Sequence, residues 1–141
     1  MACGKRYSRK REAILELLRS TRVHPTADWV YRHLKEDYPD LSLATVYRNL
    51  TAFREEGVIT SVGVVLGQER FDADLSSHSH AVCRRCGRVN DLPSTAEETT
   101  LTRGAAPHFS GQLEGCQLLF RGICQGCLDR EKENARPQKS M

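Results

Sequence analysis

Two stretches, Cys83-Arg84-Arg85-Cys86 and Cys124-Gln125-Gly126-Cys127, decide how the second half of this chain folds. Each is a Cys-x-x-Cys turn, and 37 residues separate Cys86 from Cys124. Two such turns can supply the four thiolates of a tetrahedral zinc site. The alternatives are a pair of disulfides or a thioredoxin-like redox motif, but the latter needs a single Cys-x-x-Cys at the start of a helix. We predict a structural zinc ion held by Cys83, Cys86, Cys124 and Cys127.

The length of 141 residues allows one domain or two small ones, and a zinc ion compensates for the thin core of a small domain. The chain contains no apolar run of membrane-spanning length, and its first eleven residues are basic and polar rather than typical of a secretory leader. We therefore expect a cytoplasmic protein, in which thiols stay reduced and paired cysteines bind metal.

The net charge of +3 is too small to indicate nucleic-acid binding, but its distribution is informative. Five basic residues and no acidic ones occur in the first eleven positions: Lys5, Arg6, Arg9, Lys10 and Arg11. Such a run is either a solvated start of the chain or a contact with phosphates or the minor groove. Of these residues, we retain Arg11 as a candidate DNA contact.

The first half of the chain has the pattern of three short helices followed by a hairpin. Thr26 and Ser42 are expected to cap the second and third helices, and Gly57 to end the third. The apolar positions expected to face the core are Ile14, Leu17, Leu18, Ala27, Val30, Tyr31, Leu34, Leu43, Val46, Leu50 and Phe53. Strand-like runs at 58–65 and 68–72 are joined near Gly67. This order is that of a winged helix-turn-helix, in which the third helix enters the major groove of DNA.

The outward face of the third helix carries side chains that can donate to or accept from bases and phosphates. They are Thr45, Tyr47, Arg48, Asn49 and Thr51. An ordinary solvent-facing helix would also be polar here, so the order of the elements, more than this face, favours DNA binding.

The second half is predicted to be a small α/β unit. Strands are expected at 80–83 and 88–92, around the first Cys-x-x-Cys, and at 113–123, leading to the second. Ser94 and Glu97 form a capping-box pattern that opens a helix to about Thr102, before a loop at 104–111. The fold class is α+β. The domains are a winged helix at 1–73, a hinge at 74–79, a dimerisation and metal-binding domain at 80–128, and a charged, frayed tail at 129–141.

A second cluster has nitrogen and oxygen donors. His78 and His80 point to one side of a strand, and Asp91 lies on the next strand. Alone, the two histidines are equally consistent with a surface pair near a hinge. Together with His24 and Asp72 from the first half, they make a donor set that suits divalent iron, manganese or zinc. A metal ion bound by both halves would favour one arrangement of them and act as a switch.

The chain is similar to the ferric-uptake-regulator (Fur) family of bacterial metal-dependent repressors from about Tyr7 to Leu128. The segments that carry this resemblance are 24–28 (HPTAD), 44–50 (ATVYRNL), 70–72 (RFD), 78–83 (HSHAVC) and the two Cys-x-x-Cys turns. The resemblance implies a winged-helix domain joined by a hinge to a dimerisation domain. It also implies a homodimer on an AT-rich palindromic operator.

Within the family the chain resembles the peroxide-sensing, PerR-like branch. The regulatory ligands of that branch correspond to His24, Asp72, His78, His80 and Asp91, with Fe2+ or Mn2+ as the metal. The resemblance implies that peroxide oxidises His24 or His78 in the iron form and so ends repression. The protein is then a regulator and not an enzyme. The alternative within the family is an iron- or manganese-responsive uptake regulator without peroxide sensing.

The chain departs from the family pattern in three places. The helix that usually precedes the first one is missing or short, and the common Thr-Pro-Gln-Arg signature is replaced by Ser8-Arg9-Lys10-Arg11. A further histidine-rich metal site of many iron sensors has no counterpart, because Ser77, Ser79, Gly115 and Cys116 stand near its expected ligand positions.

Two rival functions come from other classes. Two histidines and a carboxylate also describe the iron site of an oxygenase, but the chain has no His-Glu-x-x-His helix and is short for a substrate domain. A zinc-stabilised interaction module without a regulated metal is the other rival, and it would keep its operator affinity without His78 and His80.

Overall fold

A computed structural model describes residues 9–135 of the chain, which divides into two compact units between Ser76 and Ser77. Lys5 and Arg6 of the basic start, Cys3, and the last six residues of the charged tail lie outside the described residues. Among residues 9–135 no helix is long and apolar enough to cross a membrane.

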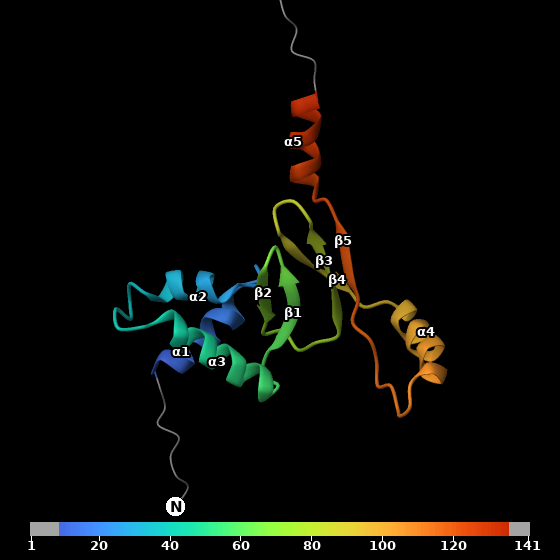
Figure 1. Cartoon of the computed structure of the whole chain (residues 1–141), viewed down its shortest axis with the longest axis horizontal. Helices are drawn as coiled ribbons and strands as arrows, with labels where there is room; N and C mark the ends of the chain where they lie inside the picture. The colour runs from blue at the N-terminus through green and yellow to red at the C-terminus, as the bar shows by residue number, and fades with distance from the viewer. Residues whose placement is uncertain (1–8, 136–141) are drawn as a thin grey trace, which may run out of the picture. The chain divides into compact units, whose positions relative to one another are not determined.

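The first unit consists of three helices and a hairpin (Figure 1). Its elements are α1 (Arg9–Ser20), α2 (Ala27–Leu34), α3 (Leu43–Glu55), β1 (Thr60–Val65) and β2 (Gln68–Asp72). The two strands pair antiparallel, with Val65 opposite Gln68 and Thr60 opposite Asp72. Three helices followed by such a hairpin form a winged helix-turn-helix, so this part of the predicted fold class is confirmed.

Helices α2 and α3 begin at the predicted caps. The Trp29 amide donates to the Thr26 hydroxyl at 3.1 Å, and the Thr45 amide donates to the Ser42 hydroxyl at 3.1 Å. Each hydroxyl satisfies an amide that has no acceptor within the first turn of its helix. Gly57 has a φ of +76°, the left-handed conformation that ends α3.

The helices pack around one hydrophobic core. Its buried residues are Ile14, Leu18, Ala27, Val30, Leu34, Leu41, Val46, Leu50, Phe53, Ile59 and Phe71. Leu43 was predicted to face this core, but it is 36% exposed. Leu43 is the first residue of α3, at the end of its inward stripe, and Leu41 before the cap fills the core instead.

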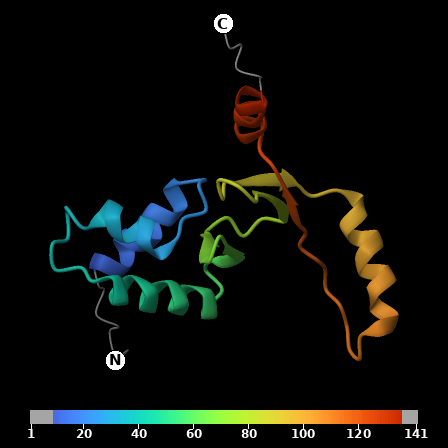
Figure 2. The ribbon, with the colours of Figure 1, turned by 45° about the horizontal axis from the view of Figure 1, so that its top comes forward.

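The second unit is built on a three-stranded sheet in the order β4-β3-β5 (Figures 1 and 2). Its elements are β3 (His78–Cys83), β4 (Val89–Pro93), α4 (Ala96–Ala105), a 3-10 turn η1 (Ala106–His108), β5 (Leu119–Gly122) and α5 (Gln125–Ala135). Strand β3 pairs antiparallel with β4 and parallel with β5. Because β3 already begins at His78, the predicted hinge at 74–79 overlaps the sheet.

Four details of this unit differ from the predictions. The capping box uses Thr95 and Glu98 rather than Ser94 and Glu97, because the Thr95 amide donates to the Glu98 carboxylate at 2.7 Å. Helix α4 and its 3-10 turn extend through most of the predicted loop at 104–111. The last strand covers only Leu119–Gly122, where the backbone reaches β3.

The fourth difference is α5, which replaces the expected frayed tail as far as Ala135. The second Cys-x-x-Cys starts this helix, because the Leu128 amide donates to the Cys124 carbonyl at 3.0 Å. The side chain of Gln125 donates to Asp129 at 2.9 Å one turn later, and Arg85 forms an ion pair with Glu131. These contacts hold a segment that has little apolar surface of its own.

The cap of α3 can be tested by replacing Ser42 with alanine. We expect Ser42→Ala to lower the free energy of unfolding by about 1 kcal/mol, because a first-turn amide loses its acceptor. The control is Thr51→Ala, at an exposed position within α3, which should leave stability unchanged or slightly higher. Urea unfolding followed by the fluorescence of Trp29, the only tryptophan, reports on this unit. Equal stability of the two variants would contradict the cap.

Candidate metal centres

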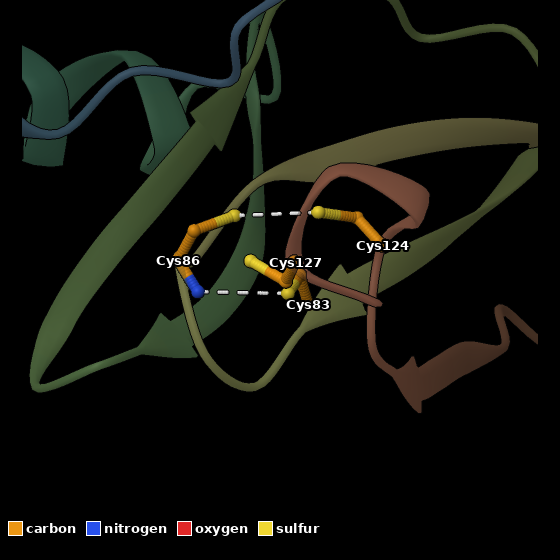
Figure 3. A group of neighbouring side chains, drawn as sticks. All are labelled: Cys83, Cys86, Cys124 and Cys127. Carbon is orange, nitrogen blue, oxygen red and sulfur yellow. Dashed lines mark hydrogen bonds between the residues drawn. The ribbon is translucent and has the colours of Figure 1, made fainter. Parts of the chain in front are cut away.

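The four thiols of the two Cys-x-x-Cys turns lie together (Figure 3). Cys83 is the last residue of β3, Cys86 lies in the turn that follows, and Cys124 and Cys127 flank the start of α5. Gly87, with a φ of +77°, lets the chain turn back toward β4. In Figure 3 the four side chains point toward one another from these two segments.

The sulfur positions suit a tetrahedral ion. One ligand atom from each cysteine lies within 4.8 Å of all the others, and the sulfurs of Cys86 and Cys124 are 3.7 Å apart. In a tetrahedral site with zinc–sulfur bonds of about 2.3 Å, the sulfurs are about 3.8 Å apart. No disulfide joins the five cysteines at positions 83–127 of the described chain. The donor set therefore fits zinc.

The electrostatics of the cluster also favour a cation. Hydrogen bonds from the backbone amides of Cys124 and Cys86 lower the pKa of Cys83 to about 5. The hydrogen bond between Cys127 and Cys124, together with burial and the other thiols, raises the pKa of Cys127 to about 12. Negative charges so close together repel one another, and a bound divalent cation would relieve that repulsion.

Two histidines and a carboxylate converge on the sheet of the second unit. Residues 78 and 80 lie on one side of β3, and His80 is paired across the sheet with Asp91 of β4. The Nε2 atoms of His78 and His80 are each 3.3 Å from Oδ1 of Asp91. The two rings meet edge to face, with centroids 4.6 Å apart. Ligand atoms about 2.1 Å from one ion are about 3.0–3.4 Å apart, so these three atoms suit one shared cation.

The first unit contains two further donors, one imidazole and one carboxylate. Nε2 of His24 lies 3.3 Å from Oδ2 of Asp72, and both side chains are buried. Asp72 ends β2, and its other oxygen accepts the Asp74 amide at 2.9 Å. His24 precedes Pro25 and the cap of α2. The pair thus offers one imidazole nitrogen and one carboxylate oxygen at the spacing of metal ligands.

The backbone of His24 has an unusual conformation. Its φ of +54° is one of only two positive values among non-glycine residues in the described chain. A residue before proline ordinarily prefers an extended backbone. A positive φ at a non-glycine residue costs about 1–3 kcal/mol and needs support from its surroundings.

Arg70 provides support that the sequence analysis did not identify. Its Nη1 donates to the carbonyls of Val23 at 3.2 Å and of His24 at 3.0 Å. The Arg-Phe-Asp segment at 70–72 could have pointed to Arg70, because Asp72 is a candidate ligand and residues two apart on a strand share a face.

The candidate DNA-contacting residues differ in how free their side chains are. Tyr47, Arg48 and Thr51 are exposed on α3. The Thr45 hydroxyl is bonded to Ser42 at 2.9 Å, and Asn49 donates to the Thr45 carbonyl at 2.9 Å, so both are partly committed to the helix. Arg48 is exposed but also donates to the Thr45 hydroxyl at 3.2 Å, so Tyr47 and Thr51 are the exposed candidates of this face without such a bond to Thr45 or Ser42.

Arg11 lies on α1 and is engaged with α3. Its guanidinium is 2.6 Å from the Glu56 carboxylate and 4.5 Å from the centre of the Phe53 ring. These contacts support the packing of the two helices, so any contact of Arg11 with DNA would compete with them.

Three residues outside the two donor sets have structural contacts. His33 stacks on Trp29 with ring centroids 3.6 Å apart, and Cys116 donates its S–H to the Glu98 carbonyl at 3.2 Å. Ser79, near the expected position of the family's further metal site, is buried and donates to the Glu98 carboxylate at 3.1 Å. Hydrogen bonds therefore occupy Ser79 and Cys116.

Comparisons with known proteins identify chains that are similar to this one. A sequence model of the Ferric uptake regulator family matches residues 2–108. The chain is 38% identical over 131 residues to the peroxide operon regulator of Bacillus subtilis (strain 168), which covers 91% of this chain and 88% of that protein.

Two solved structures share the fold. The peroxide stress regulator of Campylobacter jejuni superposes with a TM-score of 0.70 at 28% identity, over 84% of this chain and 88% of that one. The ferric uptake regulator of Pseudomonas aeruginosa, solved with manganese, superposes with a TM-score of 0.68 at 29% identity, over 85% of this chain and 90% of that one.

The four-cysteine cluster can be tested by its zinc content. We expect one zinc ion per purified chain and its loss in Cys124→Ser, because three thiolates cannot complete the site. Zinc binding to such sites contributes roughly 10 kcal/mol or more, so the variant should also melt at a lower temperature. Cys116→Ser is the control, since Cys116 lies outside the cluster. A Cys124→Ser protein with full zinc and an unchanged melting temperature would contradict the assignment.

Proposed function

The chain belongs to the ferric uptake regulator family. From this premise we propose that it is a metal-dependent transcriptional repressor, which dissociates from DNA when peroxide oxidises a ligand histidine. The observation that carries this proposal is the chemistry of the two donor groups, since all five side chains are histidines or aspartates. The similarity to the peroxide operon regulator, over most of both chains, supports the same conclusion.

Two metals have separate roles in this proposal. Zinc binds Cys83, Cys86, Cys124 and Cys127 and stabilises the second unit. One Fe2+ or Mn2+ ion takes two donors from the first unit and three from the second, namely His24, Asp72, His78, His80 and Asp91. Imidazole and carboxylate ligands suit these ions.

The regulatory step is an oxidation of the protein by peroxide. Bound Fe2+ would supply the one-electron chemistry that activates peroxide. In the net reaction the peroxide O–O bond breaks and one oxygen atom bonds to an imidazole ring carbon, whose displaced hydrogen stays on the product as O–H or N–H. The other oxygen leaves as water with the two peroxide hydrogens. The histidine loses two electrons and peroxide gains them. His24 or His78 then no longer provides its original ligand geometry. Because each event consumes a ligand, the proposed protein is a sensor rather than an enzyme.

The DNA contacts proposed for the first unit are centred on α3. Tyr47 and Arg48 would reach base edges or phosphates in the major groove, with Thr45, Asn49 and Thr51 beside them and Arg11 near the backbone. We propose that the protein binds as a homodimer to an AT-rich palindromic operator in the cytoplasm. The apolar side chains of Leu101, Leu119 and Phe120 are exposed on α4 and β5 of the second unit, which supports a partner surface there.

Mass spectrometry of the peroxide-treated protein is the simplest test of the proposed function. After brief peroxide treatment of the Fe2+ form, we expect one added oxygen on a peptide containing His24 or His78 and loss of operator binding. The Mn2+ form, treated identically, should keep its mass and its affinity. The operator can be selected from random duplexes with the Mn2+ form. An Fe2+ form that keeps both its mass and its DNA affinity would instead indicate an iron- or manganese-responsive uptake regulator.

The role of α3 is tested by Arg48→Ala. We expect binding to the selected operator to weaken by about 1–3 kcal/mol, with a smaller effect on unrelated DNA, if Arg48 reads a base edge. Arg32→Ala is the control, because Arg32 is an exposed arginine on α2 that pairs with Asp28. An equal loss on every sequence would make Arg48 a phosphate contact, and no loss would remove it from the interface.

A further inference from the structure

The left-handed conformation of His24 is held by a residue that is not itself a metal ligand. We propose that Arg70 is a positioning residue, which fixes the backbone at 23–24 so that the His24 imidazole is presented to the regulatory metal beside Asp72. This inference rests on the proposed function, because it assigns His24 and Asp72 to that metal.

Strand β2 holds the segment around His24 by three hydrogen bonds. Nη1 of Arg70 donates to the carbonyls of Val23 and His24 at 3.2 and 3.0 Å. The Phe71 amide donates to the Pro25 carbonyl at 3.0 Å. Three consecutive carbonyls are thus held by two neighbouring residues of one strand. Such anchoring on both sides of His24 can maintain a backbone conformation that the pre-proline position disfavours.

The same strand also holds the ring of His24. Residues 70 and 72 lie on one side of β2, so Arg70 and Asp72 face the same segment. Arg70 holds the backbone of His24, and Oδ2 of Asp72 lies 3.3 Å from Nε2 of its ring. The Asp74 amide holds the other Asp72 oxygen at 2.9 Å. Backbone and ring are therefore positioned together, within the first unit alone.

This arrangement means that the ligand pair is formed before metal binds. Without the donors of Arg70, the backbone at 23–24 would relax toward an extended conformation and move the imidazole away from Asp72. Metal binding would then have to restore the strained conformation, which weakens the apparent affinity. Arg70 thus sets how tightly the first unit holds the metal.

The experiment compares three variants of the full, zinc-loaded chain. Arg70→Met keeps the aliphatic stem but removes the donors, Arg70→Lys restores a single cationic donor, and Arg54→Met is the matched control. Arg54 also contacts β2, through its ion pair with Glu69 at 2.5 Å, but it does not touch the His24 segment. Mn2+ affinity is measured by calorimetry, and folding is checked by Trp29 fluorescence.

We expect Arg70→Met to bind Mn2+ about 10–100-fold more weakly, the effect typical of removing a group that orients a metal ligand. Arg70→Lys should recover most of the affinity, and Arg54→Met should stay within about twofold of the wild type. In the metal-free protein, NMR should show a shifted His24 ring signal in Arg70→Met, with the His33 ring unchanged as an internal reference. If Arg70→Met does not fold, Arg70→Gln takes its place, because its shorter side chain cannot span both carbonyls.

Unchanged Mn2+ affinity in a folded Arg70→Met or Arg70→Gln protein would overturn the inference. An equal loss in Arg54→Met would do the same, since the effect would then be general. Failure of the proposed function gives a different result: the wild-type iron form would gain no oxygen from peroxide, whereas the affinity differences among the arginine variants would remain.

Discussion

The proposed regulation depends on one constraint, the short segment that links Asp72 to His78. Asp72 is the last residue of β2 and His78 the first of β3, and six residue steps cannot span more than about 20 Å. Each unit brings its own ligands together internally, two in the first and three in the second. A short tether gives the second group of ligands a high effective concentration once the first has bound. An ion bound by both groups of ligands would therefore favour one arrangement of the two units. Loss of the ion would free the units from that arrangement.

Much of the fold could be predicted from local patterns. The caps at Thr26 and Ser42, the stop at Gly57 and strand β2 follow from residues acting on their near neighbours, and all are confirmed. The errors in α5 and β5 arose where contacts distant in the sequence decide the structure. Helix α5 is held by the second Cys-x-x-Cys and by Arg85, and β5 extends only as far as its pairing with β3. Such pairings have no signature in the segment itself.

For the candidate sites too, local sequence patterns predict one part and contacts between distant segments determine the rest. Cys-x-x-Cys spacing and alternation along β3 identified donors that the structure brings together within the second unit. The positive φ of His24 and its support by Arg70 could not be read from composition, because both depend on β2 returning to the start of α2. The sequence indicated ligand chemistry, while the structure adds the backbone geometry that positions one ligand.

Paramagnetic broadening by Mn2+ tests the central claim most directly, because the chain has only five histidines. If one ion is shared, the first equivalent of Mn2+ should abolish the NMR ring signals of His24, His78 and His80 together. The signals of His33 and His108, which belong to neither ligand group, should broaden less. Loss of His78 and His80 at one equivalent while His24 remains sharp would show that the second unit binds the metal alone, and the proposed coupling would fail.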